Sequence, residues 1–127
     1  MNFRKICGLF SAGGLGYMAL ELLWRGRTHG SMFLAGGCAF LLLGDLEQRR
    51  LPTPVKLLTG AFLITTVELT AGLLFNRDYR VWDYRQMPLN LWGQICLPYT
   101  LLWVPVAGLG MWLYDRLSQA IGHRVDF

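Results

Sequence analysis

The distribution of apolar residues constrains this chain more than any other feature of its sequence. Four apolar stretches cover residues 6–24, 32–46, 57–75 and 89–114, and short polar links separate them. The first and third stretches have 19 residues each. As α-helices they would reach roughly 28 Å, close to the ~30 Å hydrocarbon core of a bilayer. The sequence therefore predicts an all-α polytopic membrane protein, a single domain over residues 1–127 with about four transmembrane helices.

The composition excludes other protein classes. Hydrophobic residues make up 54% of the 127 residues and charged residues 16%, and the mean hydropathy is +0.36. A small soluble domain of this kind would expose large apolar patches, and the chain is too hydrophobic to be disordered. The formal net charge is +4, but the basic residues flank the apolar stretches in short clusters. That placement is typical of membrane segments and does not favour nucleic-acid binding.

Three of the apolar stretches have features that affect how they are interpreted. Arg4 and Lys5 precede the first, as in a signal peptide, but no polar mature segment follows it, so a retained helix is expected. The second is short for a span and has Asp45 near its end, which leaves a thin span, a buried helix or a re-entrant segment open. The fourth contains Pro98 and Pro105, which predict a curved or broken helix.

The links between the stretches indicate an orientation. Four spans place both termini on the same side of the membrane. That side collects seven basic residues against five on the other side. The seven are Arg4, Lys5, Arg49, Arg50, Lys56, Arg116 and Arg124, and the five are Arg25, Arg27, Arg77, Arg80 and Arg85. Because cytoplasmic loops carry the excess of Lys and Arg, we expect cytoplasmic termini in the cell membrane.

Glu68 is the most informative single residue. It lies 11 residues after Leu57, which is roughly 16 Å along the third helix and near the middle of the membrane. A charged side chain there costs about 2.5–3.5 kcal/mol, so Glu68 should face protein or a water-filled cavity. Ala61, Thr65 and Gly72 share its helical face. The opposite face carries large apolar residues that should face lipid: Leu58, Phe62, Leu69 and Leu73. Glu68 is then either functional or one partner of a structural hydrogen bond.

Two further patterns lie in the first stretch. Glu21 and Arg25 have the spacing and order of a favourable i,i+4 ion pair, which either anchors the helix at the interface or contributes to a polar path. Gly8, Ala12 and Gly16 form a stripe of small residues, which lets membrane helices approach closely, either within the chain or between two copies.

The polar links contain the remaining candidate residues. Trp82 and Tyr84 suit the aromatic belt at the membrane interface. Asp83 is expected near the start of the fourth helix, where a carboxylate would meet free backbone donors. His29, beside Arg25 and Arg27, is either solvated or in contact with lipid phosphate. The candidate intramembrane and binding residues are Glu21, Glu68, Asp83, Asn90, Arg25, Arg27, His29, Tyr84 and Trp82.

Motifs for known chemistries are missing from the chain. It contains no GxxxxGK[ST], GxSxG or HExxH pattern, which leaves ATP hydrolysis and the common hydrolase chemistries unsupported. Cys7, Cys38 and Cys96 lie in apolar runs without a CxxC spacing and are interpreted as packing residues. The sequence thus predicts no metal site and no cofactor. An enzymatic activity is less favoured but remains open.

Several runs resemble a known family. They are residues 25–37, residues 65–72, Val81-Trp-Asp-Tyr84, Pro88-Leu-Asn90-Leu-Trp-Gly93-Gln-Ile-Cys-Leu97 and Leu101-Leu-Trp103. Over residues 17–117 the chain resembles the small bacterial integral membrane proteins called putative ABC-transporter type IV, or CmpB-like. Arg85 stands where the family usually has Ser, and Gly30 where it often has Trp. The resemblance implies a membrane protein with a transport role.

Three functions remain open. In the first, the chain is a permease-like component of a transport complex, with Glu21, Glu68 and Asn90 along a polar path and a homo-oligomer or an ATPase subunit as partner. In the second, it is an intramembrane enzyme acting on a lipid or isoprenoid headgroup. Glu68 or Asp83 would then be the acid–base group, and Arg25, Arg27 and His29 would bind phosphate. In the third, it is a small scaffold or regulatory membrane protein whose polar residues only join helices.

Overall fold

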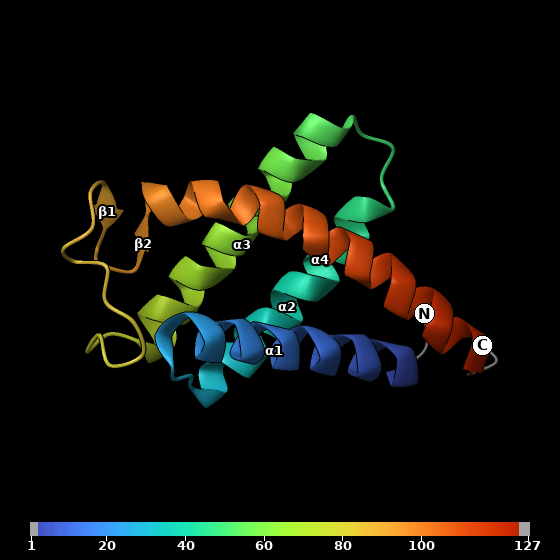
Figure 1. The fold of residues 1–127 in the computed structure, drawn as a ribbon, viewed down its shortest axis with the longest axis horizontal. Coiled ribbons are helices and arrows are strands. Elements are labelled where there is room, and N and C mark those ends of the chain that lie inside the picture. Colours follow the sequence, from blue (N-terminus) through green and yellow to red (C-terminus); the bar gives the residue numbers. More distant parts are fainter. Residues whose placement is uncertain (1–2, 125–127) are drawn as a thin grey trace.

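Four long helices make up most of the chain (Figure 1). The computed structural model describes residues 3–124, and side chains as far as Ile121, so the Arg124 side chain counted above lies outside it. The helices are α1 (Phe3–Arg25), α2 (Gly30–Glu47), α3 (Thr53–Phe75) and α4 (Leu97–Arg124). Between α3 and α4, β1 (Asn90–Leu91) and β2 (Ile95–Cys96) form an antiparallel hairpin in which Asn90 pairs with Cys96.

Each of the four helices is long and apolar enough to cross a membrane, with 18 to 25 residues in its candidate span. The predicted all-α, multi-pass membrane architecture is therefore confirmed. The second apolar segment has 15 residues, but α2 has 18 because the helix continues into Gly30, Ser31 and Glu47 at its polar ends.

The predicted start of the fourth helix is wrong. The sequence predicts a start at Leu89, but α4 begins at Leu97, after the hairpin. The backbone explains the difference: Leu89, Trp92 and Gly93 have φ values of 53°, 55° and 67°, which a right-handed helix cannot accommodate. Pro98 consequently lies in the first turn, where its missing N–H costs nothing, and only Pro105 is inside the helix. The α4 ribbon bends along its length, as a helix with an internal proline does (Figure 1).

Helices α1 and α2 pack through glycines, although not through the predicted stripe. A Cβ atom on Gly13 would collide with Phe40 and with the carbonyl oxygen of Gly36. Gly16, by contrast, has nothing within 4 Å of such an atom, and Gly8 is exposed. The stripe of Gly8, Ala12 and Gly16 is therefore not the face that packs closely on α2; that face is rotated by one residue and carries Gly13.

Helix α3 is oriented as predicted. Ala61 (3% exposed), Thr65, Glu68 (4%) and Gly72 are all buried on one face. Of the large apolar residues on the opposite side, three are exposed: Leu58, Phe62 and Leu73. The acidic side chain near the middle of the helix therefore points into the protein.

The chain order gives the bundle two distinct ends. The α1–α2 link and residues 76–96 lie at one end, which we call the loop end. The α2–α3 link, the start of α1 and the end of α4 lie at the other, which we call the terminus end (Figure 1). At the terminus end, Lys56 Nζ lies 2.8 Å from Glu47 Oε1 and ties α2 to α3.

Candidate functional site

A chain of polar contacts joins α1, α3 and the long loop. Arg25 Nε lies 3.2 Å from Glu21 Oε2, and Arg25 Nη2 donates to the Tyr84 hydroxyl at 2.7 Å. The Tyr84 hydroxyl donates to Glu68 Oε2 at 3.2 Å. Glu21, Glu68 and Tyr84 are each no more than 6% exposed. We call these four residues the polar cluster. It brings together one basic and two acidic side chains that are far apart in the sequence.

Aromatic rings surround the polar cluster. The Tyr84 ring stacks on Tyr99 with a centroid distance of 4.9 Å. The Arg25 guanidinium carbon lies 5.5 Å from the Tyr84 ring centre and 5.9 Å from that of Trp82, within cation–π range. Trp24 Nε1 donates to the Tyr99 hydroxyl at 3.1 Å. The Arg25 guanidinium is thus stabilised by the Trp82 and Tyr84 rings as well as by Glu21.

Tyr84 connects the loop to the membrane-spanning part. Burial, followed by the nearby Glu68 carboxylate, raises the pKa of the Tyr84 hydroxyl well above its ordinary value. The phenol therefore keeps its proton over the whole physiological pH range. This fixes the direction of the contacts, in which Tyr84 accepts from Arg25 and donates to Glu68.

Two buried amides shape the loop that carries Tyr84 and Trp82. Asn76 Nδ2 donates to the Trp82 carbonyl at 2.7 Å and to Gln94 Oε1 at 2.9 Å, and Asn76 Oδ1 accepts from Val81 N at 2.8 Å. Gln94 Nε2 returns a bond to the Asn76 carbonyl at 2.9 Å. Asn76 is 0% exposed and Gln94 is 2% exposed. Sequence reasoning singled out neither residue, because their pairing across 18 positions has no local pattern.

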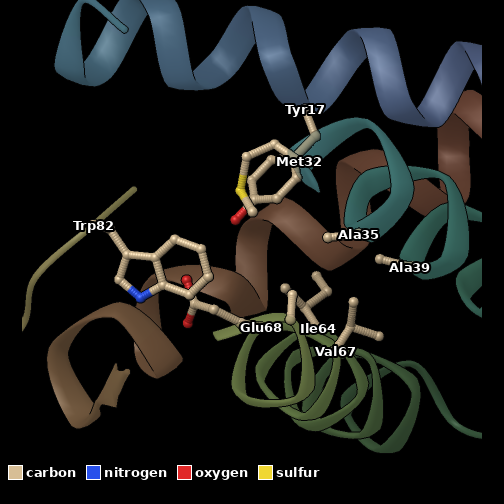
Figure 2. Close-up of a pocket in the computed structure, with 9 residues that line it drawn as sticks. Tyr17, Met32, Ala35, Ala39, Ile64, Val67, Glu68 and Trp82 are labelled. Carbon is tan, nitrogen blue, oxygen red and sulfur yellow. The ribbon is translucent and has the colours of Figure 1, made fainter. Parts of the chain in front are cut away.

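A small cavity lies against Glu68. Its volume is about 10 Å³, roughly enough for one water molecule. Figure 2 shows Glu68 rising from α3, with Trp82 on one side and Tyr17 and Met32 above. The other lining residues are apolar: Ala35, Ala39, Ile64, Val67 and Ala71.

A larger cavity of about 210 Å³ lies on the other side of the cluster, between α1 and α4. Glu21, Arg25 and Tyr84 contribute its polar part. The remaining lining residues are aromatic or aliphatic: Tyr17, Leu20, Trp24, Tyr99, Leu102, Trp103 and Val106. Of the predicted candidates, Glu21, Arg25, Glu68, Tyr84 and Trp82 therefore meet around these two cavities. Sequence reasoning assigned no binding role to Tyr99 or Trp103, whose positions depend on where α4 begins.

Asp83 and Asn90 do not join the cluster. Asp83 is exposed and binds its neighbour Arg85, with Oδ1···Nε at 2.9 Å and Oδ2···Nη2 at 2.7 Å. These bonds lower the pKa of the Asp83 carboxyl. The prediction that Asp83 lies near the start of the fourth helix is wrong, because that helix starts beyond the hairpin. Asn90 is also exposed; its Oδ1 accepts from Gly93 N at 3.0 Å and its Nδ2 donates to the Met87 carbonyl at 3.0 Å, which holds the hairpin together.

His29 and Arg27 lie in the short α1–α2 link, and both are exposed. His29 is the N-cap of α2, where its Nδ1 accepts a hydrogen bond from Ser31 N at 3.1 Å. His29 therefore caps α2, a structural role that the sequence did not predict. The structure records no contact of either residue with Glu68.

Comparison with known proteins assigns the chain to a family. No match is found among curated proteins or among solved structures. The family model described as "Putative ABC-transporter type IV" matches residues 14–126, which cover the second half of α1, the other three helices and the loop carrying Tyr84. The chain therefore belongs to this transport-related family of membrane proteins.

Proposed function

We propose that this protein is the permease-like membrane subunit of a transport complex. The observation that carries the proposal is the polar cluster, in which Arg25 pairs with Glu21 beside a cavity and is connected through Tyr84 to Glu68 of a second membrane-spanning helix. Ionisable side chains inside a membrane are costly and are typical of substrate or ion pathways. Membership in a transport-related family supports the same function.

The complex needs further subunits. The chain has no nucleotide-binding motif, so energy from ATP would have to come from a partner ATPase. Four helices also offer little surface for a complete path, so a second copy of the chain or another membrane subunit is required to close it. The larger cavity, which lies between α1 and α4, marks the side on which such a path would run.

The proposed orientation places the termini in the cytoplasm. The terminus end carries the larger number of basic residues, and the α2–α3 link, residues 48–52, lies there. An ATPase would then contact the terminus end. Impermeant thiol labelling tests this after the three native cysteines are replaced. Gln86→Cys in the long loop should react from outside intact cells, and Gln48→Cys should react only after lysis.

The decisive experiment is purification from native membranes in mild detergent, after chemical cross-linking and at native expression. We expect a homo-oligomer or a complex with an ATPase subunit. A strict monomer that recruits nothing would refute the proposal. Glu68→Gln, with Thr66→Ser on the exposed side of α3 as its control, then separates a transport subunit from a scaffold. The transport function requires loss of activity in a well-folded Glu68→Gln protein, whereas a scaffold would retain it.

The enzymatic alternative has less geometric support. It takes Glu68 or Asp83 as the acid–base group and requires Arg25, Arg27 and His29 beside it at one headgroup site. Arg25 is connected to Glu68 through Tyr84. Arg27, His29 and Asp83 are exposed, and the side chains of Asp83 and His29 contact Arg85 and Ser31.

A further inference from the structure

The long loop between α3 and α4 has two chemically different halves. Residues 76–85 contain five charged side chains: Arg77, Asp78, Arg80, Asp83 and Arg85. Residues 86–96, which include the β1–β2 hairpin, contain none, and the uncharged stretch continues through α4 as far as Tyr114. The first half of the loop therefore suits water, whereas the hairpin has the composition of the spanning helix that follows it.

The hairpin exposes large apolar side chains. Leu89 is 74% exposed, Trp92 62% and Leu91 42%. Trp82 and Tyr84, by contrast, are 2% and 4% exposed, so they face the interior and do not form the aromatic belt that the sequence suggested. Trp92 is instead the most exposed aromatic side chain of the loop. Because tryptophan is enriched where a protein crosses the membrane–water interface, the depth of Trp92 in the membrane is the next question.

The loop fixes the backbone at Trp92. The Trp92 carbonyl accepts from the Tyr79 hydroxyl at 3.0 Å, and the neighbouring Gly93 carbonyl accepts from Tyr84 N at 2.9 Å. Trp92 also has a φ of 55°, a left-handed conformation that bulky residues rarely adopt. The polar backbone of this turn is thus bound to the loop, while the Trp92 ring remains exposed to whatever surrounds the loop end.

The length of α4 sets the depth of the hairpin. The candidate span of α4, Leu97–Ile121, has 25 residues. As a helix it measures roughly 37 Å, which is longer than the ~30 Å hydrocarbon core but shorter than the ~40–45 Å of a bilayer with its headgroups. The hairpin ends at Cys96, directly before this span (Figure 1). A span of this length starts within the headgroup layer, so the hairpin lies at that depth.

Exposed apolar residues continue from the hairpin into α4. Leu97 and Leu101, one helical turn apart, are 44% and 60% exposed. Both belong to the span, so lipid already surrounds this side of α4. The bilayer therefore covers the hairpin without a further component, because its headgroup layer continues outward from the hydrocarbon that α4 contacts. A protein partner would have to displace lipid from the start of α4 to cover the same residues.

We propose that the β1–β2 hairpin is a lipid-binding element that lies in the headgroup layer of the bilayer at the loop end. Leu89, Leu91 and Trp92 contact phospholipid there. Because the hairpin has no charged residue, this contact does not require an anionic headgroup. The bond between Tyr84 N and the Gly93 carbonyl then connects the polar cluster to the membrane surface through the loop. The inference requires only that the helices span a membrane, and it does not depend on the transport function.

Photo-cross-linking identifies what the hairpin contacts. The photoreactive residue p-benzoylphenylalanine replaces Trp92. It replaces Leu101, on the exposed side of α4, as the positive control and Arg80, in the charged half of the loop, as the negative control. Each protein is reconstituted in phosphatidylcholine vesicles, checked for helix content by circular dichroism, irradiated and analysed by mass spectrometry. We expect phospholipid adducts at positions 92 and 101 and about tenfold fewer at position 80, whose charged side chain belongs in water.

Two results of this experiment would overturn the proposal. As few lipid adducts at position 92 as at position 80 would place the hairpin in water. The irradiation is also repeated in native membranes, where a partner subunit would be present. Adducts of position 92 with a second copy of the chain or with another protein, instead of lipid, would show that the hairpin is a protein interface.

Fluorescence quenching by brominated phosphatidylcholine measures the depth of Trp92. The signal of Trp92 is the difference between the unmodified protein and Trp92→Phe, which keeps an aromatic ring at an exposed position. Trp112→Phe gives the matched signal of Trp112, which is 53% exposed and lies roughly 22 Å further along α4, near the middle of the bilayer. Bromines near the glycerol should quench Trp92 about twofold more than bromines deep in the acyl chain, and Trp112 should show the opposite order.

The absence of quenching of Trp92, or the order expected for Trp112, would refute the interfacial position. These outcomes are separate from those of the transport proposal. A strict monomer whose Trp92 is quenched by the shallow bromines would leave the hairpin inference intact and count against the transport complex. An ATPase complex in which Trp92 reacts with no lipid would do the reverse.

Discussion

The Tyr84 hydroxyl lies 3.2 Å from Glu68 Oε2 and connects the long loop to an acidic side chain in the membrane-spanning part of α3. The same hydroxyl receives Arg25 Nη2 at 2.7 Å. The Tyr84 hydroxyl therefore bridges Arg25 of α1 and Glu68 of α3, and its loss would remove one hydrogen bond from each side chain.

Tyr84→Phe should lower the free energy of unfolding by about 1–3 kcal/mol, because it leaves buried groups on Arg25 and Glu68 without a hydrogen bond. Tyr79→Phe is the matched control, since the Tyr79 hydroxyl makes an exposed bond to the Trp92 carbonyl. Unfolding in mixed micelles of mild and denaturing detergent measures both variants. Equal effects of the two substitutions would show that the bridge adds nothing to stability.

Two i,i+4 ion pairs, Glu21–Arg25 and Asp45–Arg49, offer a second comparison. Arg25→Gln should cost about 3 kcal/mol, because it leaves the buried Glu21 charge uncompensated. Arg49→Gln breaks the exposed Asp45–Arg49 pair, whose side chains are 67% and 64% exposed, and should cost about 0.5 kcal/mol or less. The same unfolding assay applies. A smaller loss for Arg25→Gln than for Arg49→Gln would contradict the buried position of the cluster.

Asn76 should control the order of the long loop. Asn76→Ala removes the side-chain bonds to Trp82, Val81 and Gln94, so the loop should open more often. Trypsin should then cleave the folded protein after Arg80 and Arg85 several-fold faster than in the unmodified protein. Asn90→Ala, at an exposed position of the hairpin, is the control and should have a smaller effect on cleavage after Arg80. Unchanged cleavage in Asn76→Ala would rule out the anchoring role.

The α1–α2 contact depends more on Gly13 than on Gly16, which lies one turn away. Gly13→Ala should destabilise the fold by about 1–3 kcal/mol, because the new methyl group would overlap Phe40 and the Gly36 carbonyl. Gly16→Ala meets open space and should be neutral or slightly stabilising, since alanine favours the helix. Thermal unfolding in detergent compares the two. If Gly16→Ala instead weakens self-association, the original small-residue stripe is a contact between copies.

The pKa of Asp83 should respond to Arg85. In the folded protein the two bonds from Arg85 hold the pKa of Asp83 below its ordinary value of about 3.9. The small stabilisation is therefore complete above pH ~4 and is lost as the pH falls through the lowered pKa. Carboxyl ¹³C shifts in an NMR titration should show this pKa return toward its ordinary value in Arg85→Gln. A pKa that stays low in the variant would assign the shift to another group.

The sequence alone determined the membrane class and the direction in which α3 faces. Apolar runs of span length and a lone Glu68 on a small-residue face are local patterns, and the cost of exposing charge to lipid leaves few other outcomes. The i,i+4 spacing of Glu21 and Arg25 was also sufficient to predict their ion pair, because side chains four residues apart are neighbours on a helix.

Only the tertiary structure decided which residues accompany Glu68. Tyr84 reaches it because Asn76 and Gln94 fold the loop back over the bundle, and the hairpin delays the start of α4 to Leu97. These contacts join residues 16 and 18 positions apart, and the loop between them contains backbone in the left-handed region. No periodic pattern in the sequence predicts such contacts. The cavity between α1 and α4 likewise depends on the spacing of two helices at opposite ends of the sequence. Such long-range geometry is fixed by packing and not by any local pattern of residues.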